Sequence, residues 1–222
     1  MTQLELFEFL RQKIKHIQVQ KAKPVLVAVN GIEGTGKTTL TEKLCDYLQS
    51  QYVNAIHVTI DGFHNPKAVR YAKGRDSALG YYHDAYNENA FVEHVLEASQ
   101  SDCPHYVPAI HDLDSDEKLS LEPIFLQRDT VILTDGAYLF KNVYRPHWDL
   151  KIYLKTSFEI AQKRGIERDK LVLGGYESTK EKYLNRYHRA STIYIQENDP
   201  EACSDILIDN SDFQDLKVLK PE

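Results

Sequence analysis

The chain has 222 residues, of which 42% are hydrophobic and 27% charged. This composition is ordinary for a globular protein and excludes the disordered and fibrous classes. The 27 lysines and arginines are outnumbered by 33 aspartates and glutamates, which gives a net charge of −6. Because an acidic surface repels phosphate backbones, we expect no nucleic-acid partner, whereas a small anionic ligand still fits a local basic pocket.

Three sequence features bear on where the chain works. It has no apolar run of the about 18 residues that a membrane span needs, so we expect no membrane contact. The N-terminal stretch MTQLELFEFLRQKIK has no basic start followed by an apolar segment, which argues against a secretory signal. Cys45, Cys103 and Cys203 are widely spaced and form no CxxC pattern, so we expect a reducing, cytoplasmic setting.

The N-terminal half of the chain alternates between helical and strand patterns. Apolar residues three or four apart predict a helix over residues 4–20, and a β-branched run predicts a buried strand at 25–29. A second helix is expected at 38–49, a second strand at 55–60 and a further helix at 90–98. The polar stretch after that helix contains prolines and predicts no regular element.

The C-terminal half continues this alternation. Strands are expected at 131–134 and 151–154, and Thr156 with Glu159 forms the T-x-x-E pattern of a capped helix start. The last expected strand lies at 206–208. Short apolar strands that alternate with longer helices are typical of a parallel sheet with helices on both faces.

The fold prediction is therefore an α/β domain with about five parallel strands. No repeat or long linker marks a second domain, so we predict a single domain over residues 1–222. Glycine-containing polar segments follow the first three strands, at residues 31–38, 61–62 and 135–136. In open α/β sheets ligands bind at the carboxyl ends of the strands, so the site is expected there.

The first of these segments carries the strongest motif in the chain. Residues 31–38 read Gly-Ile-Glu-Gly-Thr-Gly-Lys-Thr and match the phosphate-binding pattern G-x-x-x-x-G-K-[ST] in full. Loop amides and a helix N-terminus attract phosphate, Lys37 can span the β- and γ-phosphates, and the Thr38 hydroxyl can bind Mg²⁺. The predicted nucleotide-binding residues are Gly31, Ile32, Glu33, Gly34, Thr35, Gly36, Lys37, Thr38 and Thr39.

Two classes of nucleotide-binding protein are disfavoured. A GTPase switch needs an N-K-x-D motif to read guanine, and the sequence has none. Residues 173–177, Leu-Gly-Gly-Tyr-Glu, lack the serine of the transporter-ATPase signature and are interpreted as a loop. The remaining classes are a kinase of small molecules and an ATPase with another output.

The second segment, Val-Thr-Ile-Asp-Gly-Phe-His at 58–64, places a carboxylate at the end of the next strand. An acceptor would lie there beside the γ-phosphate, so Asp61 can accept the proton of the attacking hydroxyl and help hold the metal. The competing interpretation is structural, because Asp-Gly is also a common turn pair.

Together with the phosphate loop, this segment resembles the uridine kinase and phosphoribulokinase family of P-loop kinases, which includes nicotinamide riboside kinase and bacterial pantothenate kinase. The resemblance covers roughly residues 20–212, and the run FHNPKAVRYAKGRDSALGYY at 63–82 is similar to the bacterial uridine kinase-like branch. It implies the P-loop NTPase fold, with Asp61 as the catalytic base.

The resemblance also implies roles around the transferring phosphoryl group. Asp135 corresponds to the second acid near Mg²⁺, although a strand-end Asp-Gly can also be a simple turn. Arg164 and Arg168 fall where the family's lid, here about 164–190, carries arginines that clamp the phosphoryl group beside Lys37. The alternative for both arginines is a solvated helix face.

An acceptor pocket follows from the same resemblance, with two of its positions left open. The predicted residues are Asp61, Phe63, His64, Tyr82 with its neighbour Tyr81, either Asp84 or Asn87, and either Arg186 or Arg189. The segment expected to read a nucleobase, residues 106–112, matches the uridine-specific pattern only in part.

The predicted activity is Mg²⁺-dependent transfer of the γ-phosphoryl group of ATP to a hydroxyl of a small-molecule acceptor. A nucleoside, uridine or cytidine, is the leading acceptor, followed by nicotinamide riboside, pantothenate or a sugar. The rival is a regulatory P-loop ATPase that acts through a protein partner. Because relatives often self-associate, the resemblance also leaves a homo-oligomer open.

Overall fold

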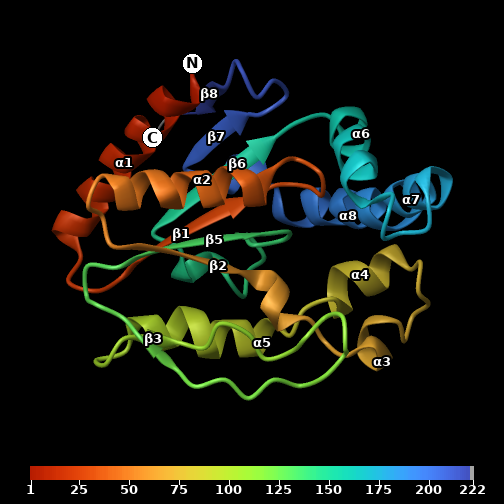
Figure 1. Cartoon of the computed structure of the whole chain (residues 1–222), viewed down its shortest axis with the longest axis horizontal. Coiled ribbons are helices and arrows are strands. Elements are labelled where there is room, and N and C mark those ends of the chain that lie inside the picture. Colours follow the sequence, from red (N-terminus) through yellow and green to blue (C-terminus); the bar gives the residue numbers. More distant parts are fainter. Residues whose placement is uncertain (221–222) are drawn as a thin grey trace.

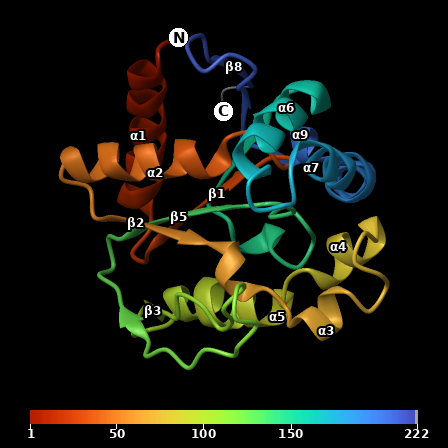
Figure 2. The same cartoon turned by 45° about the vertical axis from the view of Figure 1, so that its right-hand side comes forward.

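A central sheet dominates the computed structural model, which describes residues 1–220. Its six strands lie in the order β2-β5-β1-β6-β7-β8, and helices cover both faces (Figures 1 and 2). The strands are β1 (Val25–Asn30), β2 (Ala55–Thr59), β5 (Val131–Gly136), β6 (Leu150–Lys155), β7 (Ile206–Asp209) and β8 (Lys217–Lys220). A separate antiparallel pair joins β3 (His105–Tyr106) to β4 (Ile124–Phe125).

Helices connect these strands along the chain. The α-helices are α1 (Gln3–Gln20), α2 (Lys37–Ser50), α3 (Lys67–Arg70), α4 (Ala78–Asp84), α5 (Glu88–Phe91), α6 (Phe158–Asp169), α7 (Tyr176–Lys182), α8 (His188–Asn198) and α9 (Pro200–Cys203). The tighter 3₁₀ turns are η1 (Ile60–Phe63), η3 (Ala98–Gln100) and η4 (Arg145–His147), and the wider π turns are η2 (Val92–Glu97) and η5 (Tyr183–Tyr187). Within residues 1–220, none of the helices is both long and apolar enough to cross a membrane.

The predicted α/β fold with a largely parallel sheet is confirmed. Each of the five expected positions carries a strand, and the pairs β2–β5, β5–β1, β1–β6 and β6–β7 are all parallel. The sixth strand, β8, was not predicted and runs antiparallel to β7. Its Lys-Val-Leu-Lys sequence is mostly exposed at the sheet edge, so it lacks the continuous apolar run of a buried strand.

The strand order brings the polar segments together. Strand β5 lies between β1 and β2, and Asp135 of β5 is in register with Val29 on one side and Thr59 on the other. The phosphate loop, which follows β1, and Asp61, which follows β2, therefore flank the carboxyl end of β5. This edge is where an α/β sheet binds its ligands.

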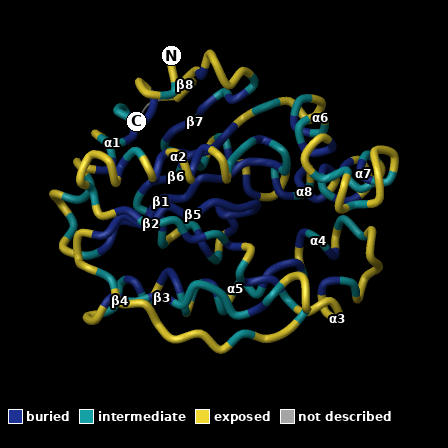
Figure 3. Tube along the Cα trace, in the orientation of Figure 1, coloured by how far each residue is buried: buried dark blue, intermediate teal, exposed yellow. Residues whose placement is uncertain are grey.

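The sheet separates two hydrophobic cores because its side chains alternate between faces. Val25, Val27 and Val29 of β1 pack with α1 and α2, whereas Leu26 and Ala28 belong to the core beneath α4, α5 and α8. Figure 3 shows the central strands β1 and β5 buried along their length, whereas the edge strand β8 and most loops are exposed.

Trp148 anchors the second of these cores. Its side chain is buried, its Nε1 donates to the carbonyl of Leu139 at 2.7 Å, and its ring lies 6.4 Å from that of Phe91. The indole thus fixes the start of β6 against the segment that follows β5, with its polar atom satisfied as a buried tryptophan requires.

Two predicted helix starts need correction. The capping box expected from Thr156 and Glu159 is not formed, because Ser157 is the N-cap of α6 and accepts from the amide of Ile160 at 3.2 Å. Thr156 faces the chain after β7 instead, with its Oγ1 at 3.4 Å from Oγ of Ser211. The helix expected at 90–98 begins at α5 and continues through the wider turns of η2.

Candidate active site

The phosphate loop between β1 and α2 depends on glycine at two positions. Gly34 and Gly36 adopt φ angles of 86° and 91°, a left-handed conformation that other residues rarely tolerate. A Cβ on Gly34 would also lie 2.1 Å from the carbonyl oxygen of Ala161 in α6. Inside the loop, Thr35 Oγ1 donates to the carbonyl of Ile32 at 3.0 Å. The loop is therefore held in one shape, against α6 and at the N-terminus of α2, where phosphate binds favourably.

Lys37, the first residue of α2, folds back over the loop. Its Nζ donates to the carbonyl of Ile32 at 3.0 Å. Burial lowers the pKa of Lys37, although the nearby charges of Glu33, Asp135 and Asp61 act in the opposite direction. Within residues 1–220 Lys37 forms no ion pair, so a bound triphosphate would provide its direct anionic partner.

Asp135 is held by two donors at the end of β5. Its Oδ2 accepts from the Thr38 hydroxyl at 2.6 Å, and its Oδ1 lies 2.7 Å from Nε2 of His57. Burial alone would raise the pKa of Asp135, but the hydrogen bonds from His57 and Thr38 and the charge of Lys37 bring it below its usual value. The carboxylate is thus ionised and fixed in orientation beside the phosphate loop.

Asp61 lies on η1, directly after β2, and is more exposed than Asp135. Its Oδ1 accepts from the Tyr86 hydroxyl at 3.1 Å, and its amide donates to Oγ1 of Thr59 at 3.3 Å. The remaining carboxylate oxygen, Oδ2, makes no hydrogen bond within residues 1–220.

A single small cavity of about 120 Å³ joins these groups. Its polar lining residues are Glu33, Lys37, Thr38, Asp61, Tyr81, Tyr86, Asp135 and Arg168. The structure therefore brings together the predicted base, the predicted metal ligands and the phosphate-loop lysine. Tyr86 and His57 were missed, although a polar residue such as His57 within an otherwise apolar strand is a signal that sequence analysis can use.

Two predicted acceptor residues belong to the core instead. Phe63 is fully buried and packs edge-on against Phe91, with 5.1 Å between ring centres. Tyr82 is buried as well, and its hydroxyl donates to Glu197 at 2.8 Å and accepts from Asn198 at 2.9 Å. Neither side chain lines the cavity, whereas Tyr81, the alternative at that position, does.

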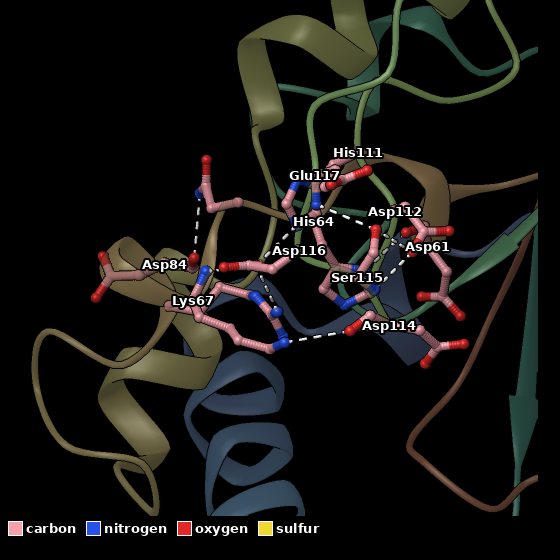
Figure 4. Close-up of polar contacts among 12 residues, drawn as sticks. Asp61, His64, Lys67, Asp84, His111, Asp112, Asp114, Ser115, Asp116 and Glu117 are labelled. Atoms are coloured by element: carbon pink, nitrogen blue, oxygen red, sulfur yellow. Dashed lines mark hydrogen bonds and ion pairs between the residues drawn. The ribbon is translucent and has the colours of Figure 1, made fainter.

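The other acceptor candidates from this region do not line the cavity. His64 supports the turn, with Nδ1 at 2.7 Å from the Asp61 carbonyl. Asp84 pairs with Lys73 at 2.6 Å, and Asn87 caps α5 by accepting from an amide. In Figure 4, Asp84 and Asp61 lie on opposite sides of the labelled group. The structure thus places neither Asp84 nor Asn87 beside Asp61, the predicted catalytic base.

The two arginines of α6 that were predicted to clamp the phosphoryl group have different surroundings. Arg164 donates to the carbonyls of Asn210 and Ser211, each at 2.8 Å, and its guanidinium lies 3.7 Å from the Phe213 ring centre. It lines a larger cavity of about 630 Å³ on the α6 side of the phosphate loop and not the one with Asp61. The structure thus places Arg164 away from the cavity of Asp61, and its contact with the transferring phosphoryl group stays a prediction.

Arg168 lines both cavities. Its side chain is 65% exposed, and its Nε donates to Asp169 at 2.7 Å, so it is paired with its own neighbour. Asp169 also accepts from the Tyr183 hydroxyl at 2.8 Å. Arg168 is thus placed at the cavity that holds Asp61, but reaching a phosphoryl group requires it to leave Asp169.

The turn η5, which precedes α8, contains one buried arginine. Arg186 is buried against tyrosine rings, whereas its alternative Arg189 is exposed. Further along α8, the hydroxyl of Ser191 donates to Glu33 at 2.7 Å, which ties the phosphate loop to this helix. The other oxygen of Glu33 accepts from Tyr138 at 3.3 Å.

A parallel sheet, a glycine loop that opens a helix, and two carboxylates beside the loop lysine define a P-loop phosphotransferase. Residues 26–210 match the profile of the Phosphoribulokinase / Uridine kinase family, and the chain belongs to this family. The enzyme is accordingly a phosphotransferase with an alcohol group as acceptor.

Individual relatives agree with this assignment. The chain is 28% identical to a uridine kinase from Anoxybacillus flavithermus over 172 residues, which is 74% of this chain and 77% of the relative. It is also 28% identical to a uridine kinase from Limosilactobacillus reuteri, over 70% of this chain and 69% of the relative. Among solved structures, a possible uridine kinase from Bacillus stearothermophilus shares the fold, with a TM-score of 0.65, 20% identity and coverage of 89% and 98%.

Proposed function

We propose that this enzyme transfers the γ-phosphoryl group of ATP to a hydroxyl of a small polar molecule, with Asp61 as the base. The observation that carries this proposal is the small cavity in which Lys37, Asp61 and Asp135 meet. Phosphoryl transfer needs groups that hold the donor phosphates and a carboxylate that receives the hydroxyl proton, and this cavity is lined by both.

The larger cavity suits the nucleobase of ATP. Arg164 and Phe213 present two flat groups that can lie against an aromatic ring, which gives Arg164 a base-binding role in place of a phosphoryl clamp. Gly34 and Arg168 line both cavities, so a triphosphate can run from one to the other over the phosphate loop.

The residues beside the loop fit Mg²⁺. Thr38 and Asp135 provide a hydroxyl and a carboxylate, which are the hard oxygen donors that Mg²⁺ prefers. No group of three or more metal-binding side chains lies within residues 1–220, in keeping with a metal that takes its remaining ligands from phosphates and water. When bound, Mg²⁺ neutralises charge on the β- and γ-phosphate oxygens.

Asp61 is oriented for proton transfer. Tyr86 holds its Oδ1 at 3.1 Å, which leaves Oδ2 for the acceptor hydroxyl. As the acceptor oxygen bonds to the γ-phosphorus, its proton moves to Asp61 and the bond to ADP breaks. Lys37 holds the donor phosphates, and Arg168 can donate to the moving phosphoryl group once it leaves Asp169.

The acceptor class has two candidates. The names of the relatives suggest a neutral nucleoside, uridine or cytidine, as predicted from the sequence. The residues predicted to hold its ribose, Asp84 or Asn87, are however engaged outside the cavity. An alcohol that carries an anionic group is the second candidate, and it is favoured by two buried arginines, Arg70 and Arg186, whose Nε atoms lack hydrogen-bond partners.

Replacing Asp61 tests the proposed chemistry. Asp61→Asn keeps the shape but removes the charge and most of the basicity, so kcat should fall by at least about 100-fold. ATP affinity should stay within about threefold, because the phosphate loop and Lys37 hold the triphosphate. Coupled ADP release and nucleotide titration measure the two quantities.

Asp84→Asn is the matched control, since Asp84 is a nearby aspartate that pairs with Lys73 outside the cavity. It should leave kcat unchanged. A folded Asp61→Asn enzyme that turns over within a few-fold of wild type would show that the carboxylate only forms a turn. Hydrolysis that responds to a protein partner and to no alcohol would instead support the regulatory ATPase.

A further inference from the structure

Two buried arginines on the acceptor side of Asp61 lack adequate partners. Arg70 of α3 is 5% exposed and Arg186 of η5 is 7% exposed, and the Nε of each is buried without a hydrogen-bond partner. Within residues 1–220, Arg186 forms no hydrogen bond or ion pair. Within the same residues, Arg70 forms one polar side-chain contact, to Oδ1 of Asp116 at 3.5 Å.

That one carboxylate is already shared. Oδ1 of Asp116 accepts from the amide of Lys67 at 2.9 Å and lies 3.0 Å from Nε2 of His111, both shorter than its contact with Arg70. Figure 4 shows Asp116 within this group. Asp116 therefore meets Arg70 only through one long contact at 3.5 Å, and no hydrogen bond or ion pair joins it to Arg186 within residues 1–220.

Aromatic rings connect the two arginines to the cavity. Both guanidinium groups lie over the ring of Tyr71, Arg70 at 5.2 Å and Arg186 at 5.3 Å from its centre. Arg186 also lies 4.8 Å from the ring of Tyr81, and Tyr81 lines the cavity that holds Asp61. Arg186 is thus one side chain away from the cavity that holds Asp61, and the ring of Tyr71 joins Arg70 to Arg186.

The positive charge of Arg70 also affects His64, which lies next to Asp61. Burial lowers the pKa of His64, and the positive charge of Arg70 adds to this effect, although Asp61 acts against it. His64 stacks on Tyr86, whose hydroxyl holds Asp61. Arg70 therefore acts on the immediate support of the base.

Such an arrangement is unfavourable unless an anion completes it. A buried charge without a partner is strongly destabilising, and cation–π contacts compensate only in part while the Nε–H groups stay unsatisfied. A guanidinium presents Nε–H and Nη–H as a planar fork that matches the two oxygens of a carboxylate or a phosphate.

We propose that Arg70 and Arg186 form an anion subsite of the acceptor pocket, so that the acceptor is a small alcohol carrying a carboxylate or a phosphate ester. The hydroxyl of this acceptor lies at Asp61, and its anionic group lies at the two guanidinium groups. The proposal rests on the proposed phosphotransferase function. It adds to that function the charge of the substrate and the residues that select it.

Matched acceptor pairs test the proposal on the unmodified full chain with Mg²⁺ and ATP. The pairs are glycerate and glycerol, pantothenate and panthenol, ribulose 5-phosphate and ribulose, with uridine and cytidine as neutral nucleosides. We expect a charged member to exceed its neutral partner by at least about tenfold in kcat/KM, because charge-assisted hydrogen bonds discriminate strongly. The carboxylate and phosphate pairs distinguish the two sources of the anion. Preference for uridine, cytidine or another neutral acceptor would overturn the proposal.

Variants locate the subsite. Arg70→Gln and Arg186→Gln should each raise KM for the preferred charged acceptor by at least about tenfold and leave KM for ATP within about twofold. Arg75→Gln is the control, because Arg75 lies over the same Tyr71 ring at 5.8 Å but is exposed. A higher KM for ATP in Arg186→Gln, with an unchanged KM for the acceptor, would assign the arginine to the nucleotide instead. Should one variant not fold, the other and the acceptor pairs still decide.

Binding separates the subsite from the reaction. If ATP binds but none of the acceptors is phosphorylated, the proposed function fails for this panel, and the subsite is judged alone. Calorimetry with glycerate and with inorganic phosphate, in a Lys37→Ala background that weakens the phosphate loop, should show binding that Arg70→Gln or Arg186→Gln abolishes. Absence of binding, or binding that survives both substitutions, would overturn the subsite.

Discussion

Two carboxylates stand at neighbouring strand ends, and their surroundings give them different tasks. Asp135 is buried and accepts from Thr38 and His57, so it is held still. Asp61 is exposed and keeps one oxygen free. A fixed carboxylate suits a metal, whereas an accessible oxygen suits a proton in transit. The pair was predicted from strand ends and family resemblance, but His57 was not, because its partner Asp135 is 78 positions away.

At the residue scale we predict that His57 positions the metal-holding carboxylate. Removing an outer partner of a metal ligand typically lowers metal affinity or activity by about 10- to 100-fold. In His57→Ala, Asp135 keeps Thr38 but is free to rotate, so the Mg²⁺ concentration for half-maximal activity should rise by about that factor. ATP binding without Mg²⁺ should not change.

His16→Ala provides the reference, since His16 is exposed on α1, away from the cavity. A Mg²⁺ titration of the three proteins by coupled ADP release makes the measurement. The assignment of Asp135 as a metal ligand would be contradicted by a His57→Ala enzyme with the Mg²⁺ requirement of wild type.

Among the elements, α6 shows how one helix can serve two cavities. Arg164 and Arg168 are one turn apart, yet Arg164 binds the carbonyls after β7, whereas Arg168 reaches past the loop toward Asp61. Helical spacing alone places both on one face. Their separation depends on the chain around Asn210 and Ser211, more than forty residues away, so no local pattern could reveal it. The proposed lid, about 164–190, comprises the end of α6, α7, η5 and the first residues of α8.

His188 makes the packing of this segment sensitive to pH. It lies between α6 and η5, with its ring 4.8 Å from Phe158 and 5.5 Å from Tyr183, and burial lowers its pKa to about 4. The unfolded chain, with a histidine pKa of about 6.5, takes up the proton first as the pH falls. The contribution of His188 to stability is therefore complete above about pH 6.5 and is lost as the pH falls toward 4.

We predict how much stability the protein loses through His188 as the pH falls. Between pH 7 and pH 5, the free energy of unfolding should fall by about 2 kcal/mol more in wild type than in His188→Gln, which cannot take up the proton. Urea titrations followed by circular dichroism measure the free energy of unfolding of both proteins at both pH values. Equal pH dependence in the two proteins would show that His188 titrates normally in the folded state.

The sequence predicts where the strands lie along the chain better than it predicts which strands are neighbours in the sheet. Apolar runs identified the five parallel strands, because strands covered on both faces consist mostly of apolar residues. The position of β5 between β1 and β2, which assembles the site, is set by contacts between distant segments. The strand-end motifs could be predicted because their chemistry is local. The burial of Phe63 and Tyr82 could not be predicted in this way. Whether an aromatic side chain faces a cavity or the core depends on the helices that pack over it.

The buried indole at the start of β6 gives this molecule a built-in optical reporter. Trp148 is the single tryptophan among 14 tyrosines, and it lines neither the cavity of Asp61 nor that of Arg164. Selective excitation of its fluorescence should therefore report loss of the core beneath the sheet as a red shift toward the emission of a solvated indole. Nucleotide and acceptor should leave the native spectrum unchanged, so that ligand-induced stabilisation of every variant can be followed without a label. A spectrum that shifts on nucleotide binding would show instead that the core and the cavities move together.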